Sequence, residues 1–268
     1  MYYFVSPKIY PLFPNFVGDL LFIVDFKKEV ISKLRNADFS GTVTFEISAF
    51  SDKKKFFSDK VAVEFDKGET TTQPKIYRMP SRDYGYVEIS IIADKSIFHN
   101  SYAGGGYAIL EKKSGDYLTV NTDAKFSQYR IIEQIKAWGK FSLVHTAIIN
   151  QSSCSELAKN SFLLVNPYEK TVVVTLSNNR EKIVKTKVDA LSAVIVDLEP
   201  LADGEKVFDV ILTSNNRIIA YDVKHLGDIV NVNNIDHLDV YSGISTTVAG
   251  FKNNVKNTLK VIQRQFLS

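Results

Sequence analysis

The chain has 268 residues, of which 45% are hydrophobic and 24% are charged, and its formal net charge at neutral pH is +3. This composition is ordinary for a globular protein, and no stretch approaches the roughly 20 apolar residues of a membrane-spanning helix. Residues 246–268 contain four cations and no acidic residue, so the rest of the chain sums to −1. This distribution excludes a nucleic-acid-binding fold with a wholly basic face.

The N-terminal segment and the cysteine content point to a reducing compartment. The first 16 residues contain three prolines, one lysine and no apolar core, unlike a secretory signal. A single cysteine, Cys154, excludes an internal disulfide framework and a multi-cysteine metal site. We therefore expect a cytoplasmic protein, with a virion as the alternative location.

Strand patterns dominate the chain. In residues 41–50, Val43, Phe45 and Ile47 alternate with polar residues, which is typical of a strand with one buried face. Similar short runs, rich in β-branched and aromatic residues and bounded by turn-forming residues, predict further strands. The predicted strands are residues 41–50, 60–65, 86–93, 141–150, 161–168, 171–176, 193–198, 207–213 and 217–223. Their spacing of about ten residues favours an antiparallel sandwich or barrel.

Turn signals separate several of these strands. The same tetrapeptide, Ser-Asn-Asn-Arg, occupies residues 177–180 and 214–217, and both copies predict hairpin turns because Asn tolerates left-handed backbone. The lysines at 53–55 are typical of a solvated hairpin end. Residues 113–116 predict the turn of another hairpin, and a short connector helix is expected over residues 129–138.

A weak internal repeat divides the chain. Residues 19–29 resemble 161–170, residues 41–65 resemble 170–198, and residues 86–98 resemble 207–223. Two tandem copies of one sandwich unit explain this order. The predicted fold is therefore all-β, with two tandem antiparallel β-sandwiches, immunoglobulin-like or jelly-roll-like, and a C-terminal amphipathic helix. The predicted domains are residues 1–135, residues 136–245 and the helix at 246–268.

Three runs in the second half carry a resemblance to a known family. These are FLLVNPYEKTVVVTL, KVDALSAVIVDLEPL and VFDVILTSNNRIIAYDVKH. Together they resemble the small β-sandwich domains that include the transducer proteins of bacterial sensory rhodopsins, with a fainter echo in the first half. The resemblance implies the sandwich fold and a role as a binding or oligomerising module. It carries no functional residues, and both the tandem arrangement and the basic C-terminal segment depart from the family.

One segment could bind a metal. Residues 221–243 contain several acidic and histidine side chains, from which we select Asp222, His225 and His237 as candidate ligands for zinc, manganese or iron. Such a site would support metal-assisted hydrolysis. The alternative is a polar loop after the last strand, and we favour it because the spacing matches no known ligand motif. We expect no cofactor.

Tyrosines gather around a glycine-rich stretch. Residues 104–106 are all glycine but lack the rest of a phosphate-binding motif, so they predict a bend or bulge before a strand. Exposed tyrosines form flat surfaces on which sugars stack. The candidate ligand-binding residues are Tyr84, Tyr86, Tyr102, Tyr107 and Tyr117. Core filling is the alternative interpretation of this cluster, and we favour it.

The last 18 residues have the pattern of a basic amphipathic helix. The apolar stripe comprises Phe251, Val255, Leu259, Ile262 and Phe266, and the cations are Lys252, Lys256, Lys260 and Arg264. This helix could dock on its own sandwich, pair with a second copy, lie on an anionic membrane or meet nucleic acid. Self-docking and homo-oligomerisation are favoured because an exposed apolar stripe promotes aggregation.

No catalytic motif is present, so we expect a non-enzymatic structural or interaction protein that self-associates and presents a binding surface. Three alternatives stay open. They are a carbohydrate-binding module that takes a polysaccharide on the tyrosine cluster, a viral capsid or tail component, and a metal-dependent hydrolase.

Overall fold

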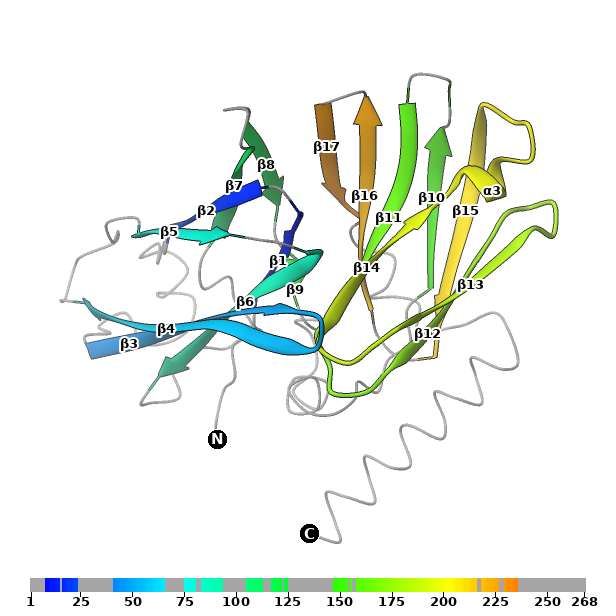
Figure 1. Cartoon of the computed structure of the whole chain (residues 1–268). Coiled ribbons are helices and arrows are strands. Elements are labelled where there is room, and N and C mark those ends of the chain that lie inside the picture. The colour runs from blue at the N-terminus through cyan, green and yellow to red at the C-terminus, as the bar shows by residue number, and fades with distance from the viewer. Residues whose placement is uncertain are drawn as a thin grey trace, which may run out of the picture. The chain divides into compact units, whose positions relative to one another are not determined.

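The computed structural model divides the chain into two compact units, residues 1–134 and 135–268 (Figure 1). It describes residues 8–14, 16–23, 41–65, 75–80, 83–93, 105–112, 117–121, 123–124, 147–153, 155, 158–215, 218–226 and 229–235. Strands make up most of these residues, and the sheets are antiparallel, which confirms the predicted all-β sandwich fold. None of the helices in the described segments is long and apolar enough to cross a membrane.

The first unit contains two antiparallel sheets. In spatial order, one sheet comprises β4 (Lys54–Phe65), β3 (Gly41–Ser51), β6 (Gly85–Ala93), β1 (Lys8–Leu12) and β9 (Asp123–Ala124). The other comprises β5 (Lys75–Pro80), β2 (Phe16–Ile23), β7 (Gly105–Lys112) and β8 (Tyr117–Asn121).

The second unit also contains two antiparallel sheets, of four strands each. One comprises β10 (Ala147–Ser153), β15 (Val207–Ser214), β12 (Val172–Ser177) and β13 (Ile183–Val188). The other comprises β14 (Ser192–Asp197), β11 (Ala158–Asn166), β16 (Ile219–Leu226) and β17 (Ile229–Asn234). A single helical turn, α3 (Glu199–Ala202), connects β14 to β15.

The two units have the same strand connectivity. The order β4-β3-β6-β1 in the first unit corresponds strand for strand to β13-β12-β15-β10 in the second. The order β5-β2-β7-β8 likewise corresponds to β14-β11-β16-β17, and only β9 has no counterpart among the described strands. The sequence repeat aligned the β2, β3–β4 and β6 segments with segments that contain β11, β12–β14, and β15 with the start of β16. The shared connectivity supports two tandem copies, but β14 and β16 correspond to β5 and β7, which the aligned segments of the first half did not include.

Two predicted turns are confirmed, and one is wrong. The lysines at 53–55 lie at the end of the β3–β4 hairpin, and residues 177–180 open the β12–β13 turn. The turn predicted at 113–116 lies outside the described residues, although the strands on either side of it, β7 and β8, pair as a hairpin requires. The second Ser-Asn-Asn-Arg does not form a hairpin, because β15 and β16 belong to different sheets. Instead, the Asn215 backbone N–H donates to the carbonyl oxygen of Val173 (3.2 Å), and the Asn215 side-chain oxygen accepts from the Val173 N–H (2.9 Å).

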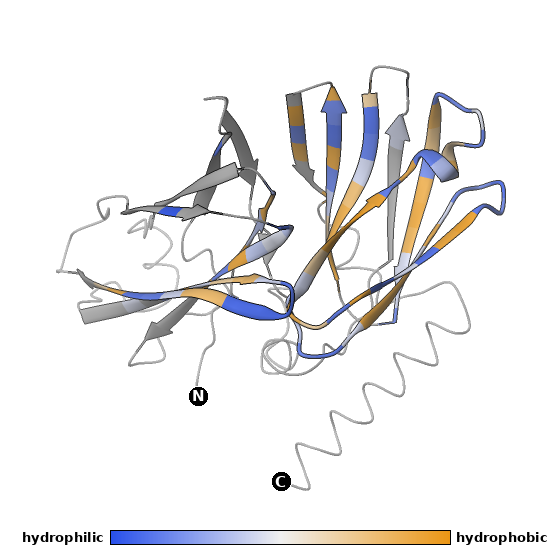
Figure 2. Ribbon diagram, in the orientation of Figure 1, coloured by the Kyte–Doolittle hydropathy of each residue, from blue (hydrophilic) through white to orange (hydrophobic). Residues whose placement is uncertain are grey.

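The core of the second unit follows from the two-residue period of its strands. In β12, Val172, Val174 and Leu176 are buried and their neighbours are more exposed. These side chains pack with residues of the opposite sheet, including Phe162 and Leu164 of β11. Figure 2 shows the hydrophobic residues along these strands and hydrophilic residues at the β12–β13 turn and around α3.

The sheet that contains β11 and β16 is buried on both faces. Phe162, Leu164 and Ala220 belong to the core between the two sheets. Leu163 and Tyr221, which point to the other face because side chains alternate along a strand, are also fully buried. This explains why the β11 sequence is an almost continuous apolar run rather than an alternating one.

One buried asparagine ties three segments of the second unit together. Asn166, at the end of β11, is fully buried. Its amide nitrogen donates to the carbonyl oxygens of Lys170 (2.8 Å), Val188 (3.1 Å) and Asp189 (2.8 Å). Its side-chain oxygen accepts from the Tyr168 N–H (3.2 Å). These bonds satisfy the amide and fix the turn after β11 against the end of β13.

The β3–β4 hairpin of the first unit has a turn of two residues. Asp52 (φ 46°) and Lys53 (φ 64°) both adopt left-handed backbone, as the tight turn requires. Near this end Gly85 of β6 lies opposite Ser51. A Cβ atom at Gly85 would lie 2.3 Å from the carbonyl oxygen of Phe50, so only glycine allows this approach.

Several sequence predictions lie outside the described residues. These are the domain boundaries at 135 and 245, the connector helix at 129–138 and the C-terminal helix at 246–268 with its apolar and basic stripes. They stay predictions.

We expect Gly85→Ala to destabilise the protein by about 2 kcal/mol, because the added methyl group must displace the backbone of the neighbouring strand. Urea denaturation followed by circular dichroism would measure the change. Ser58→Ala, at an exposed position of β4 in the same sheet, is the control and should leave the free energy of unfolding nearly unchanged. Equal stability of the two variants would contradict the close approach at Gly85.

Candidate functional site

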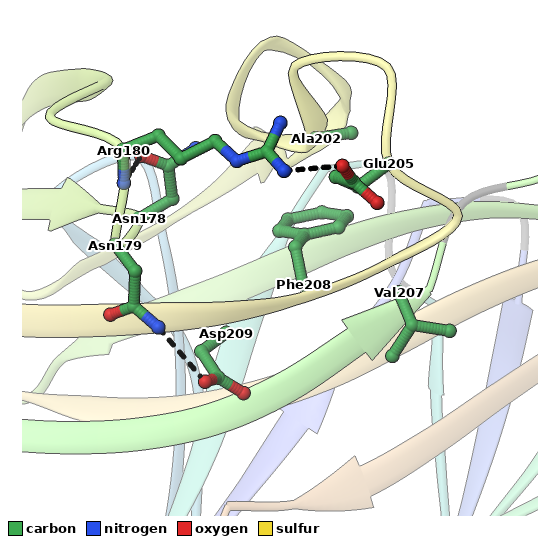
Figure 3. Close-up of a pocket in the computed structure, with 8 residues that line it drawn as sticks. All are labelled: Asn178, Asn179, Arg180, Ala202, Glu205, Val207, Phe208 and Asp209. Carbon is green, nitrogen blue, oxygen red and sulfur yellow. Dashed lines mark hydrogen bonds and ion pairs between the residues drawn. The ribbon is translucent and has the colours of Figure 1, made fainter.

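A surface pocket of about 260 Å³ lies between the β12–β13 turn and the segment from α3 to β15 (Figure 3). We call it the turn pocket. Its lining residues are Asn178, Asn179, Arg180, Ala202, Glu205, Val207, Phe208 and Asp209. The pocket therefore combines two amides, a guanidinium and two carboxylates with three apolar side chains.

Asn178 holds the turn in place. Its side chain is buried, and its amide nitrogen donates to the carbonyl oxygen of Leu201 (2.7 Å). Its side-chain oxygen accepts from the N–H groups of Arg180 (2.9 Å) and Lys182 (3.0 Å). The turn thus carries its own internal hydrogen bonds and is also anchored to α3.

Three polar pairs bridge the turn and the α3–β15 segment. The Asn179 amide donates to Asp209 Oδ2 (3.0 Å). The Arg180 guanidinium forms an ion pair with Glu205, and both groups are visible at the pocket rim in Figure 3. Lys182 Nζ lies 3.3 Å from Asp203 Oδ1. Each pair is solvent-exposed and individually weak, but together they restrict the side chains that line the pocket.

The backbone after α3 positions the residues that line the other side of the turn pocket. Asp203 (φ 48°) and Gly204 (φ 83°) adopt left-handed backbone and end the helical turn, after which the chain enters β15. Phe208 follows with its side chain 8% exposed, so most of the ring belongs to the core. Val207, at 55% exposure, adds an apolar side chain next to it.

This arrangement can bind a small polar molecule that also has an apolar face. The carboxylates of Glu205 and Asp209 accept hydrogen bonds, whereas Arg180 and Asn179 donate them. Apolar contact comes from Phe208 and Val207. Because the turn is anchored through Asn178, these groups are held in position before a ligand arrives.

The predicted tyrosine cluster does not form one surface. Tyr86 is fully buried and stacks on Phe50 with ring centroids 5.0 Å apart. Tyr84 is partly buried in edge contact with Phe13 (6.1 Å), and burial raises its pKa. Tyr107 and Tyr117 belong to the other sheet, where Tyr117 pairs with Glu111, four residues along β7 from Tyr107. Tyr102 lies outside the described residues.

The candidate metal ligands are not brought together either. Asp222 and His225 are three residues apart on β16, so their side chains point to opposite faces of the sheet. His237 lies outside the described residues. Among the residues that the structure describes, no group of three His, Cys, Asp or Glu side chains could hold a metal ion. Within the described residues of this segment, Ile219–Leu226 and Ile229–Asn234 form a strand pair rather than the favoured polar loop.

Sequence reasoning missed the turn pocket. It identified residues 177–180 only as a turn and gave no role to Glu205 or Asp209. The one available signal was the Asn-Asn pair, since buried asparagines commonly hydrogen-bond their own turn. Asp209 is 30 residues from Asn179 and Glu205 is 25 residues from Arg180 in the chain, and only the fold shows that they are neighbours.

Comparisons with known proteins identify no relative. Neither the models of known protein families nor the curated proteins contain a match. Among solved structures, the chain is weakly similar to the crystal structure of Ruminococcus gnavus beta-glucuronidase, with 12% sequence identity and a TM-score of 0.14. The match covers 87% of this chain and 45% of that one. A similarity this low carries no argument about fold or function, and the resemblance to the transducer family stays a prediction.

We expect Asn178→Ala to destabilise the protein by about 3 kcal/mol, because three hydrogen bonds of a buried amide are lost. Asn179→Ala, the neighbouring substitution, is the matched control and should cost less than about 1 kcal/mol, since it removes one exposed bond. Denaturant unfolding of both variants would measure the difference. A similar loss in the two would show that Asn178 does not anchor the turn.

Burial lowers the pKa of His225 below its usual 6.5. The folded state therefore resists protonation, and the free energy of unfolding should fall as the pH drops from about 6.5 through the folded-state pKa. We expect the histidine NMR titration to give a value below 6.5, and His225→Gln to remove this part of the pH dependence. A pKa at or above 6.5 would contradict the partial burial of the imidazole.

Proposed function

We propose that the chain is a non-enzymatic interaction protein that presents the turn pocket of its second unit to a hydroxyl-rich ligand of the saccharide class. The observation that carries this proposal is the preformed combination of Asp209, Glu205, Arg180 and Asn179 beside Phe208. A pyranose ring offers the matching chemistry, because its hydroxyl groups both donate and accept hydrogen bonds and its C–H face packs on apolar side chains.

The volume of the pocket suits a small ligand. At about 260 Å³ it is slightly smaller than the roughly 300–1,000 Å³ of drug-sized ligand sites. A single sugar unit, for example the end or one residue of a polysaccharide, fits this scale. Since the pocket lies at the surface, the rest of a longer chain could continue into solvent.

The carboxylates of the turn pocket are held by partners within the protein. Glu205 is paired with Arg180, and Asp209 accepts a hydrogen bond from Asn179. Each carboxylate has further lone pairs, so both can also accept hydrogen bonds from the hydroxyl groups of a ligand.

Self-association stays part of the proposed role. It depends on the apolar stripe predicted for residues 251–266, which lie outside the described residues. Two weak sugar sites carried by an oligomer would bind a repeating polysaccharide more tightly than either site alone, because the second binding event becomes intramolecular.

We expect a glycan array probed with the full chain to identify a ligand, and calorimetric titration to measure its affinity. Asp209→Ala and Glu205→Ala should each weaken binding about tenfold or more, because each removes a charged hydrogen-bond acceptor from the pocket. Thr213→Ala, an exposed position farther along β15, is the control and should bind like the unmodified chain.

Two outcomes would contradict the proposal. One is the absence of binding to every glycan class. The other is binding that Asp209→Ala and Glu205→Ala leave unchanged, which would move the ligand away from the turn pocket. Circular dichroism would first establish that each variant is folded.

A further inference from the structure

Strand β11 contains two fully buried asparagines that differ in their hydrogen bonding. Asn166 and Asn160 are both 0% exposed, and they point to the same face because they are six residues apart on one strand. Asn166 uses all of its hydrogen-bonding capacity on backbone groups. At Asn160, neither the amide nitrogen nor the oxygen bonds to any residue that the structure describes. Leaving a buried amide unpaired is costly, so this side chain needs a partner.

Two more buried side chains at this end of the second unit each carry a polar atom that bonds to none of the described residues. Ser152 of β10 is 1% exposed and its hydroxyl bonds to none of the described residues. Asp222 of β16 is 6% exposed; its Oδ2 lies 3.6 Å from Lys224 Nζ, while its Oδ1 is unpaired within the described part of the chain. Unpaired groups on three separate strands are unusual in one small interior.

Strand register directs all three side chains into the interior between the sheets. Asp222 lies directly opposite Phe162, and Ser152 lies opposite Phe208, and both phenylalanines belong to the core. Side chains directly opposite each other share a face, so Asp222 and Ser152 point into the core as well. Asn160 is two residues from Phe162 and therefore shares its face.

The same register places these residues at one end of the unit. Asn160 pairs with Lys224, so Asn160 and Asp222 are diagonal neighbours on adjacent strands. Ser152 and Asn160 flank the connection from β10 to β11, which is closed by reciprocal backbone hydrogen bonds between Ser155 and Ala158 (3.1 and 3.2 Å). Figure 1 shows β10 and β11 meeting at this end.

We propose that ordered water molecules bind in the interior between Ser152, Asn160 and Asp222. Water suits this site because it both donates and accepts hydrogen bonds. The three side chains offer it one hydroxyl, one amide and one carboxylate oxygen. The Lys224 ammonium beside Asp222 already supplies a positive charge, which favours water over a metal cation. Burial raises the pKa of Asp222 while Lys224 acts against this rise, in keeping with a polar but enclosed position.

The test is NMR detection of bound water at the Asn160 side chain in the full chain, with Asn166 as the internal control. Rotating-frame cross-peaks between water and the Asn160 amide protons are expected, with the sign of dipolar contact rather than of proton exchange. The Asn166 amide protons, which are bonded to three carbonyl groups, should show none.

Three results would overturn the proposal. The Asn160 amide protons could lack a water cross-peak, which would mean that the interior is dry. Equal cross-peaks at Asn160 and Asn166 would mean that solvent enters the unit generally rather than at one site. Elemental analysis that finds one metal ion per chain, lost in Asp222→Asn, would assign the site to a cation instead.

Discussion

The second unit depends on the pairing of its buried asparagines. An unpaired amide in an apolar interior costs more than the net gain of an ordinary hydrogen bond, so a sequence that buries one must provide its partners. Asn166 joins the end of β11 to the end of β13, and Asn178 joins the β12–β13 turn to α3. The two residues fix opposite ends of the same hairpin, and the strands between them can then pack their alternating valines into the core.

This constraint explains why the turn pocket is preformed. The turn of residues 178–182 is too polar to pack on the core, yet the amide of its first residue, Asn178, is buried and bonded to Leu201. The exposed members of the turn, Asn179 and Arg180, are consequently held over the α3–β15 segment, which contains Asp209 and Glu205. Polar groups that the fold needs for its own stability thus also form the surface available to a ligand. Binding to such a surface requires little additional ordering of side chains.

Local pattern predicted most of the strands but not their partners. Alternation in residues 172–177 is visible in the sequence because β12 has a buried face and a more exposed face. Residues 41–50 show the same alternation in sequence, but the structure buries Ile47, Ser48, Ala49 and Phe50 alike, so the expectation of one exposed face is wrong at that end of β3. The strand β1 was missed, since Pro11 lies within it and proline normally interrupts a sheet. The structure accommodates Pro11 because β9 pairs only with Lys8 and Ile9 on that side of β1.

The two Ser-Asn-Asn-Arg segments show where sequence reasoning ends. One copy, residues 177–180, begins a hairpin turn, whereas the strands on either side of the other copy, β15 and β16, belong to different sheets. The difference depends on the pairing of the next strand, because β16 pairs with β11 rather than with β15. Similarly, Asp222 and His225 are three residues apart in the sequence, and their side chains point to opposite faces only because both residues lie on the strand β16. Packing between residues that are far apart in the sequence decides these outcomes, and no local sequence pattern indicates it.

The repeated connectivity of the two units makes their turns the main source of difference. In the first unit the corresponding hairpin, β3–β4, closes through two residues, Asp52 and Lys53, in left-handed backbone. In the second unit five residues separate β12 from β13, and they are long enough to reach β15 and to bury an asparagine. A tight turn keeps its side chains in solvent, whereas a longer turn that is anchored by a buried side chain can form one side of a pocket. The same arrangement of strands therefore ends in a structural hairpin in the first unit and in a candidate binding site in the second. This agrees with the general tendency of functional residues to lie in loops held by a rigid scaffold.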